Sequence, residues 1–442
     1  MPPCRFADPH RWPVYPSSGR QQRLDRAQAK TESPARPEPG IVRPMRNVIY
    51  ILIVAVLLTT GILLLVLPSA VRALPGRYAS LLPEPLQQLR HSDHLMVLPT
   101  PDAALPPVAT LEPAESLQPS PTPSLPPPSA TSSPTHTTAS DPTSTPQPTA
   151  TPIPTLPARV LLENGRHERQ GWNNCGPTTL AMALSFWGSE ATQSDIAPLL
   201  KPDPEDKHVG IEQMADYAAS AGLQATTRSG GTLEGLKRFL HAGIPVIIES
   251  WYVRDAQDQM GHYRLVVGYD EATQLFDLYD SLYDPPTTMT YDELYELWRV
   301  FNWTYLVVAP PDRWVTVLGI LGADVDDGAM LQSALARSSA EAQDPPLACV
   351  AYAACSDWIT FSWYTVGTNY TALGRHEEAS EAYDRARQLG LHYRMLWYQF
   401  GPYESYYAVG RFEDVIALAN ATLATASNLE ESYLWRAKAR LA

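Results

Sequence analysis

Hydrophobic residues follow different patterns along the chain, and each pattern predicts a different kind of structure. Residues 48–67 form an uncharged apolar run of 20 residues, VIYILIVAVLLTTGILLLVL. This is about the length that an α-helix needs to cross a hydrocarbon core of ~30 Å. We therefore expect a transmembrane signal anchor over residues 47–68.

The residues before this run are basic, with nine Lys or Arg against four acidic residues. Positive charge keeps the adjacent end of a transmembrane helix in the cytoplasm, so residues 1–46 are expected to form a cytoplasmic tail. The alternative is a secretion signal that starts at Met45 and is cleaved near Ala73. Both interpretations place the following residues outside the cytoplasm, either on a single-pass protein of the cell membrane or on a secreted one.

Hydrophobic periodicity is absent between residues 99 and 157, where Pro, Ser and Thr alternate in PTP-like repeats. Such a composition cannot bury enough apolar surface to fold. At ~3.1 Å per residue in a polyproline II helix, these roughly 60 residues reach at most ~180 Å. We interpret residues 69–158 as an extracytoplasmic linker rich in Pro, Ser and Thr.

Amphipathic patterns return near residue 160. Apolar residues recur with helical spacing from Leu180 to Trp187, and Pro177 stands in the first turn. This pattern predicts a buried helix that opens at Cys175. Helical patterns over residues 210–221 and 233–241 follow, and then come the β-rich sequences IPVIIESW, HYRLVVGYD and QLFDLYDS.

Helices followed by antiparallel strands are typical of an α+β domain, which we expect over residues 159–311. The remaining residues, 312–442, have a helical and repetitive pattern. ALGRHEEA at residues 372–379 recurs as AVGRFEDV at residues 408–415, a period of 36, close to the ~34 of a tetratricopeptide repeat. We expect an all-α tetratricopeptide-like repeat domain that serves as a scaffold or binds a protein partner.

Charge and cysteine content narrow the range of functions. The formal net charge of −14 argues against nucleic acid as a partner, because a phosphate backbone needs a basic surface. The four cysteines are too few for a disulfide framework, although Cys349 and Cys355 are close enough in sequence for a local disulfide. No pattern typical of a metal site is present, and we expect neither a metal nor another cofactor.

Cys175 is the candidate nucleophile. It opens the predicted helix within the sequence QGWNNCGPTTLAM. A thiol in the first turn lies beside unpaired backbone N–H groups and the positive end of the helix dipole, which favour the thiolate and lower the pKa. The alternative, a buried structural cysteine, does not explain the Gly-Pro helix start.

His262 is the candidate general base. It opens an apolar strand, GHYRLVVGYD, where a side chain can project from the rim of a sheet. If this strand and QLFDLYDS form a hairpin centred on Glu271, Asp280 lies opposite His262 and its carboxylate can orient the imidazole. Asp284 is the competing candidate for the orienting acid.

Attack of a thiolate on a carbonyl carbon also requires hydrogen-bond donors for the developing oxyanion. The backbone N–H of Cys175 and the side-chain amide of Gln170 are the candidates.

The sequences QGWNNCGPTTLAM, GHYRLVVGYD and FDLYDS together resemble the papain-like cysteine peptidases related to the double-glycine leader peptidases of bacteriocin exporters, the C39-like family. The resemblance covers roughly residues 160–310. It implies Cys175 as nucleophile, His262 as base, Asp280 as orienting acid and Gln170 as oxyanion residue. Gln170 departs from the family, because slightly more residues usually separate it from the cysteine. The chain also lacks the GxxxxGK[ST] phosphate loop of an exporter.

The sequence therefore predicts a membrane-anchored, extracytoplasmic cysteine peptidase that hydrolyses peptide or amide bonds of a peptide or protein substrate through a Cys-His-Asp triad. The alternative is a catalytically weak, peptidase-like binding or scaffold protein at the cell surface, whose helical repeats recruit a protein partner. Acyl transfer to an amine would use the same residues.

Overall fold

The computed structural model describes residues 42–73, 82–83, 86, 98–101, 156–254, 258–344 and 355–442. Two compact units are present, residues 1–67 and 68–442. Most of the predicted cytoplasmic tail and most of the predicted linker lie outside the described residues. The same holds for Cys349 and the side chain of Cys355, so the predicted local disulfide stays a prediction.

Helix α1 (Val42–Ala73) contains the apolar run, and its described side chains over residues 48–62 are largely exposed. No helix in the described part of the chain is long and apolar enough to span a membrane. The structure thus contains a helix here but does not support the transmembrane anchor that the uncharged apolar run predicted over residues 47–68.

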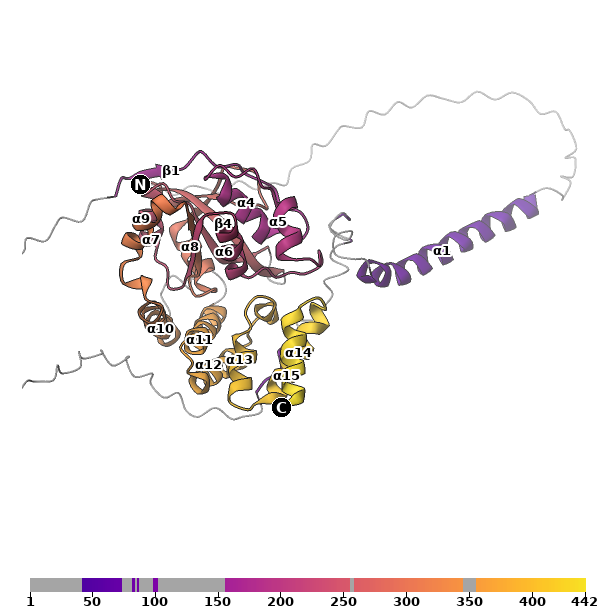
Figure 1. Ribbon diagram of the computed structural model, residues 1–442. Coiled ribbons are helices and arrows are strands. Elements are labelled where there is room, and N and C mark those ends of the chain that lie inside the picture. Colours follow the sequence, from indigo (N-terminus) through magenta and orange to yellow (C-terminus); the bar gives the residue numbers. More distant parts are fainter. Residues whose placement is uncertain are drawn as a thin grey trace, which may run out of the picture. The chain divides into compact units, whose positions relative to one another are not determined.

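A seven-stranded antiparallel sheet lies at the centre of residues 159–309 (Figure 1). Its strand order is β2-β7-β3-β4-β5-β6, and β1 pairs with β4 outside this order. The strands are β1 (Arg159–Leu161), β2 (Gln224–Arg228), β3 (Val246–Val253), β4 (Gln259–Asp270), β5 (Leu275–Tyr279), β6 (Thr287–Thr290) and β7 (Tyr305–Ala309). The antiparallel sheet and its helices agree with the predicted α+β fold.

Helices cover both faces of this sheet. Ile247 and Leu265 belong to a core with α4 (Cys175–Ser185) and α6 (Ile211–Ser220). Val246 and Val266, one position away, belong to a second core with α7 (Leu233–His241) and α8 (Tyr291–Arg299). Because successive side chains of a strand point to opposite faces, burial on both faces makes β3 and β4 nearly continuous apolar sequences.

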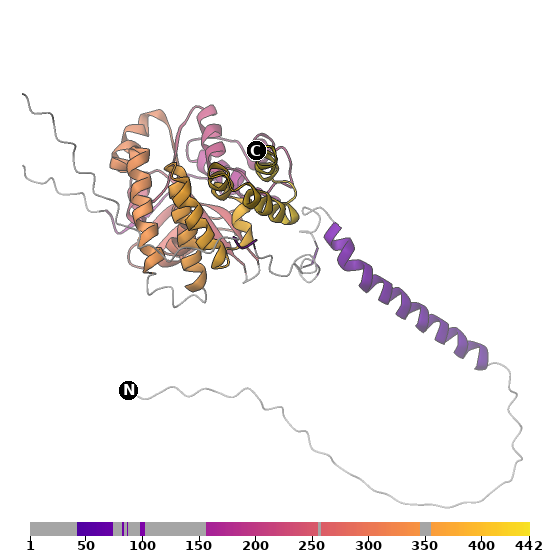
Figure 2. The same ribbon diagram turned by 90° about the horizontal axis from the view of Figure 1, so that it is seen from below.

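The C-terminal region is helical, as predicted. We call residues 355–442 the helical module. Figure 2 shows its helices beside α10. The remaining helices are α5 (Gln193–Leu200), α9 (Trp314–Leu321), α10 (Asp327–Gln343), α11 (Cys355–Ala372), α12 (His376–Gln388), α13 (Gly401–Ala408), α14 (Phe412–Thr425) and α15 (Glu430–Leu441), with 3-10 turns η1 (Pro311–Arg313), η2 (Gly322–Val325) and η4 (Tyr393–Trp397).

The two glycines of the predicted repeat occupy equivalent places in the helical module. Gly374 follows α11 with φ 71°, and Gly410 follows α13 with φ 78°. Both lie in the left-handed region, which glycine adopts without steric cost. The repetition in sequence thus marks two helix ends, while the tetratricopeptide identity of the module stays a prediction.

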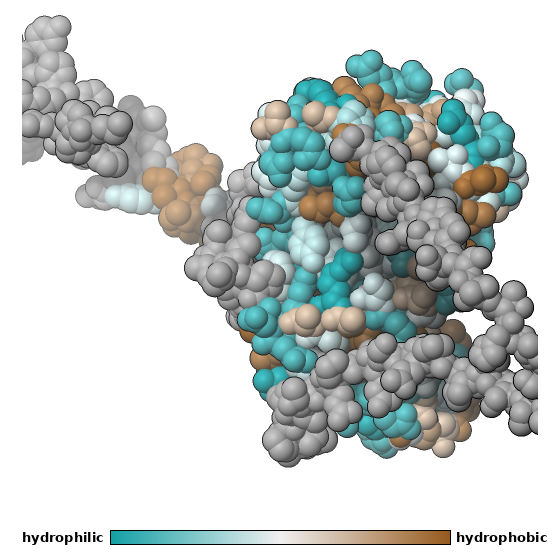
Figure 3. Space-filling view, turned by 90° about the vertical axis from the view of Figure 1, so that its left-hand side faces the viewer, coloured by the Kyte–Doolittle hydropathy of each residue, from teal (hydrophilic) through white to brown (hydrophobic). Residues whose placement is uncertain are grey.

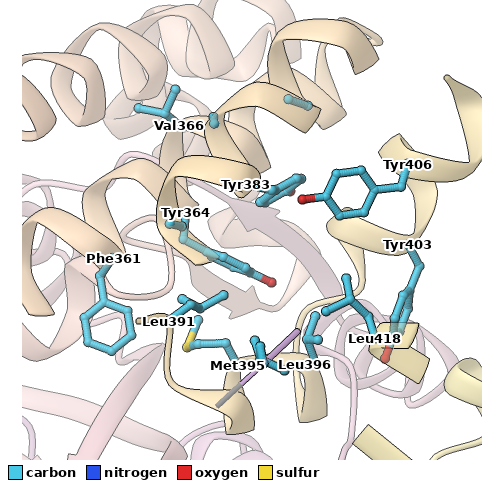
Figure 4. Packing of buried hydrophobic residues seen from close by; sticks show 14 of the residues in the cluster. Phe361, Tyr364, Val366, Tyr383, Leu391, Met395, Leu396, Tyr403, Tyr406 and Leu418 are labelled. Atoms are coloured by element: carbon cyan, nitrogen blue, oxygen red, sulfur yellow. The ribbon is translucent and has the colours of Figure 1, made fainter. Parts of the chain in front are cut away.

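Buried contacts join the helical module to the sheet region. The aromatic core of the module (Figure 4) also includes Trp251 of β3, whose ring centroid lies 5.6 Å from that of Phe361. The side-chain amides of Asn302 and Asn369 exchange hydrogen bonds of 2.8 and 3.0 Å. Fully satisfied polar groups in a core favour one fixed arrangement. On the face shown in Figure 3, the described residues are mainly hydrophilic, with hydrophobic ones scattered among them.

Part of the predicted linker is ordered against the helical module. Leu98 is only 3% exposed and belongs to the core of the module. The carbonyl oxygen of Pro99 accepts a hydrogen bond of 2.9 Å from Nε of Arg387. The expectation of an unfolded linker is therefore wrong for residues 98–101, because an apolar site and a buried donor are available there.

Candidate active site

Cys175 is the first residue of α4 and remains partly exposed. Asn173, two residues earlier, has φ 53°, a left-handed conformation that costs roughly 1–3 kcal/mol for a residue other than glycine. Its side-chain amide donates a hydrogen bond of 3.2 Å to the carbonyl oxygen of Glu205, which helps to hold the turn. This turn brings the thiol to the N-terminal end of the helix, as the sequence predicts.

His262 and Asp280 form a buried hydrogen-bonded pair. His262 lies in β4 and is 3% exposed, and Asp280 follows β5 and is 1% exposed. Nε2 of His262 and Oδ1 of Asp280 are 2.8 Å apart. His262 and Cys175 line the same cavity, and the interaction between them lowers the pKa of the thiol and raises that of the imidazole. Because Nε2 contacts Asp280, Nδ1 is the ring nitrogen that remains to exchange a proton with the sulfur.

The strand register differs from the one predicted. Leu265 pairs with Tyr279 and Val266 with Leu278, and an irregularity follows between Val266 and Gly268. The hairpin centre therefore lies after Glu271. In this register Asp280 continues the strand opposite residue 264, and its contact with His262 runs diagonally across the two strands. The predicted pair forms, but the direct opposition assumed for it is wrong.

Arg264 is a residue of the site that the sequence reasoning missed. Its Nε donates a hydrogen bond of 3.0 Å to Oδ2 of Asp280, and both side chains are buried. The same guanidinium donates to the hydroxyl of Ser250 and to the carbonyl of Trp251. Both oxygens of Asp280 are thus bound, one by His262 and the other by the guanidinium of Arg264. The available signal was the spacing of two between His262 and Arg264, which places them on one face of β4.

The pKa values of the three side chains shift in directions that favour an ion pair. Burial raises the pKa of Cys175, but the hydrogen bond and charge of His262 and the N–H groups of Tyr263 and Gly176 outweigh it and lower the pKa overall. Burial lowers the pKa of His262, but Asp280 raises it above its ordinary value. Despite burial, His262 and Arg264 hold the pKa of Asp280 well below its usual range.

The other two predicted site residues are Gln170 and Asp284. Oε1 of Gln170 accepts a hydrogen bond of 2.7 Å from the hydroxyl of Ser281, next to Asp280. Gln170 is not among the described residues that line the cavity beside Cys175. Asp284, the competitor of Asp280, is largely exposed and lies 3.6 Å from Arg169.

A narrow cavity of about 10 Å³ lies beside Cys175. Its lining includes Glu249, a buried carboxyl group whose pKa burial raises well above the ordinary value, with the charges of Glu212 and Cys175 adding to the effect. Burial also lowers the pKa of His208, another lining residue, to about 4. Burial therefore favours the neutral form of both groups. Tyr398 of the helical module completes this side of the cavity.

Metal binding receives no support from the described residues, among which no group of three or more His, Cys, Asp or Glu is arranged to hold a metal ion.

The arrangement of Cys175, His262 and Asp280 is suited to nucleophilic catalysis, in which an ionised thiol attacks a carbonyl carbon and the imidazole transfers protons.

Comparison with known proteins gives one family match. Residues 159–306, about a third of the chain, match the Peptidase_C39 like family, which supports a cysteine-peptidase interpretation of this region. A protein from Bacillus anthracis described as a "putative C39-like peptidase" aligns with 34% of this chain and 97% of its own, at 17% identity and a TM-score of 0.29. No curated protein matches the chain.

Proposed function

We propose that the chain is a cysteine peptidase that hydrolyses peptide or amide bonds through Cys175, His262 and Asp280. The observation that carries the proposal is that Cys175 and His262 line one cavity, while the imidazole is hydrogen-bonded to a carboxylate that Arg264 also holds. The match of residues 159–306 to a peptidase family supports the same reaction class.

In the proposed reaction the thiolate of Cys175 attacks the scissile carbonyl carbon and forms a tetrahedral oxyanion. His262, as imidazolium, gives its proton to the leaving amine as the C–N bond breaks, which leaves a thioester on Cys175. Neutral His262 then accepts a proton from water, and the hydroxide formed attacks the thioester, releasing the acid and the thiolate. Asp280 does not react but keeps the imidazole oriented and stabilises its charged form.

Stabilisation of the oxyanion is part of the proposal. Cys175 is the first residue of α4, so its N–H has no partner within the helix. The hydrogen bond from Ser281 engages the oxygen of the Gln170 amide, so the NH₂ group of that amide points away from Ser281. We propose that this NH₂ group and the N–H of Cys175 receive the developing charge when a substrate binds.

The test is the rate at which iodoacetamide labels Cys175 in the full-length chain, followed by mass spectrometry of the peptide that contains it. His262→Ala should slow labelling at pH 7, because the imidazole stabilises the thiolate. Cys175→Ala identifies labelling at the other cysteines. Equal rates at Cys175 in wild type and His262→Ala would overturn the proposed pair, and a peptide library with Cys175→Ala as control tests hydrolysis itself.

One observation favours a second candidate function. Gln170, the expected oxyanion residue, does not line the cavity beside Cys175, which favours a peptidase-like binding or scaffold protein of weak catalytic activity. A peptide library that is bound but not cleaved would support this alternative. The extracytoplasmic location and a protein partner on the helical module are further parts of our proposal, and both rest on the sequence alone.

A further inference from the structure

The cavity beside Cys175 is not formed by the peptidase-like region alone. Its lining includes Tyr398, which follows η4 in the helical module. This residue lies outside residues 159–306, the part of the chain that matches the peptidase family. A side chain supplied by the accessory module therefore borders the candidate nucleophile.

The ring of Tyr398 packs against the backbone next to His262. A Cβ atom added at Gly261 would lie 3.0 Å from Cδ2 of Tyr398 and 3.0 Å from Cζ of Phe301. Such distances are too short for an ordinary contact, so the absence of a side chain at Gly261 makes room for the ring. Tyr398 also lies near His208, with ring centroids 6.4 Å apart.

The backbone that carries Tyr398 is fixed to the strand that carries His262. Nη1 of Arg394, in η4, lies 2.8 Å from Oδ1 of Asp258 and donates a hydrogen bond of 2.9 Å to the carbonyl oxygen of Gln259. The Arg394 side chain is 6% exposed, so solvent screens this ion pair little. Tyr398 is thus a fixed wall of the cavity.

The cavity has room for about one water molecule. We propose that Tyr398 determines substrate specificity by limiting the side chain on the acyl side of the scissile bond to a small one. This inference rests on the proposed peptidase function. The acyl residue bound to the sulfur has to place its side chain beside Cys175, where the phenol ring occupies the space.

Alkylating agents that differ only at the carbon attacked by sulfur test this inference without a known substrate. Iodoacetamide is compared with its α-methyl and α-benzyl analogues on the full-length chain, and each rate at Cys175 is divided by the rate with free cysteine. The wild type should discriminate against the α-benzyl compound. Tyr398→Ala should reduce this discrimination by about 10-fold or more, the effect expected of a pocket that gains several methylenes of space.

Two variants serve as controls. Tyr398→Phe keeps the ring and should keep the discrimination. Tyr407→Ala removes a tyrosine of the same module that packs on Phe412 and Trp435, and it should leave the discrimination as in the wild type. Unchanged discrimination in a folded Tyr398→Ala chain would overturn the proposal.

Tyr398→Leu provides a second test if Tyr398→Ala does not fold, because it keeps apolar packing while shortening the side chain. It should give a smaller loss of discrimination in the same direction, and a discrimination equal to that of the wild type would again contradict the inference. The proposed function fails separately. If the iodoacetamide rate at Cys175 does not depend on His262, the catalytic pair is wrong. The inference about Tyr398 is judged instead from the ratio of the rates with the different reagents.

Discussion

Two buried aspartates each hold a cluster of ion pairs, one in the sheet region and one in the helical module. Asp280 is bound by His262 at 2.8 Å and by Arg264 at 3.0 Å. Asp384 of α12 is bound by Arg411 at 2.6 Å and by the hydroxyl of Tyr406 at 2.7 Å. Burial and hydrogen-bond geometry are similar in the two clusters, and neither distinguishes a catalytic site from a structural one.

The difference lies in the partners. His262 is a titratable group whose pKa Asp280 raises, and it lines the same cavity as Cys175. Arg411 stays protonated and joins Asp384 to Asp414, which links α12 to α14. A buried charge cluster alone is therefore weak evidence for function. A titratable group between the carboxylate and a nucleophile is the stronger sign.

Removing the imidazole should give the largest contrast between the clusters. His262→Ala should lower kcat/KM by about 10²- to 10⁴-fold, because the general acid and base is lost. Asp384→Asn should leave kcat/KM of the folded fraction unchanged, because its cluster does not touch Cys175. Initial rates on a peptide selected from the library, corrected for folded protein by circular dichroism, measure both values. Similar losses of kcat/KM in the two variants would contradict the distinction between the two clusters.

Removing one guanidinium from each cluster should change the free energy of unfolding. Arg264→Met should cost about 3–5 kcal/mol, because it leaves a buried carboxylate with one cationic partner. Arg411→Met should cost less, about 1–3 kcal/mol, because that side chain is 27% exposed and water can replace part of its contacts. Urea denaturation of the two variants gives the comparison, which is contradicted if Arg411→Met is the more destabilising.

The pH dependence of alkylation should separate the clusters as well. The pKa of Cys175 is lowered, so thiolate persists below the usual thiol pKa and the rate falls only as pH drops through the lowered value. In His262→Ala the burial that raises the pKa remains while its main opposing cause is gone. The rate should then fall at a higher pH. The profile of Asp384→Asn should coincide with that of the wild type, and a shifted midpoint there would count against the distinction.

Local signals explain what the sequence predicted correctly. Pro177, the helical spacing after it and Gly188 define α4, which begins at Cys175 and is followed by Gly188 at φ 81°. The apolar sequences of β3 and β4 likewise correspond to strands. Each of these elements depends mainly on residues within a few positions, so pattern and propensity suffice.

Contacts between distant residues explain what was missed. The pair of His262 and Asp280 forms, but the register was wrong because the turn spans residues 271–274, so the hairpin centre lies beyond Glu271, and no local pattern marks this. From the sequence alone, Arg264 is one polar residue of a strand. Its place in the site depends on its contact with Asp280, which is distant in sequence. Tyr398 reaches the cavity only through the docking of the helical module.

The smallest expected effect concerns the segment that attaches to the helical cluster. Leu98→Ala should lower the free energy of unfolding by about 1 kcal/mol. Burial of a leucine contributes roughly 1.5–3 kcal/mol, and the alanine that replaces it keeps part of that burial. Leu434→Ala, at a residue of α15 that is 54% exposed, is the matched control and should change stability little.

The role of Arg387 makes this last comparison informative. Its Nε donates to the carbonyl of Pro99, and its Nη1 lies 2.8 Å from Asp414 and 3.5 Å from Asp384. If the cluster around Asp384 serves attachment, Leu98→Ala should change the urea midpoint without changing the alkylation rate of Cys175. A slower alkylation rate in Leu98→Ala would mean that the helical cluster influences the nucleophile, and the separation between a catalytic and a structural aspartate would then be wrong.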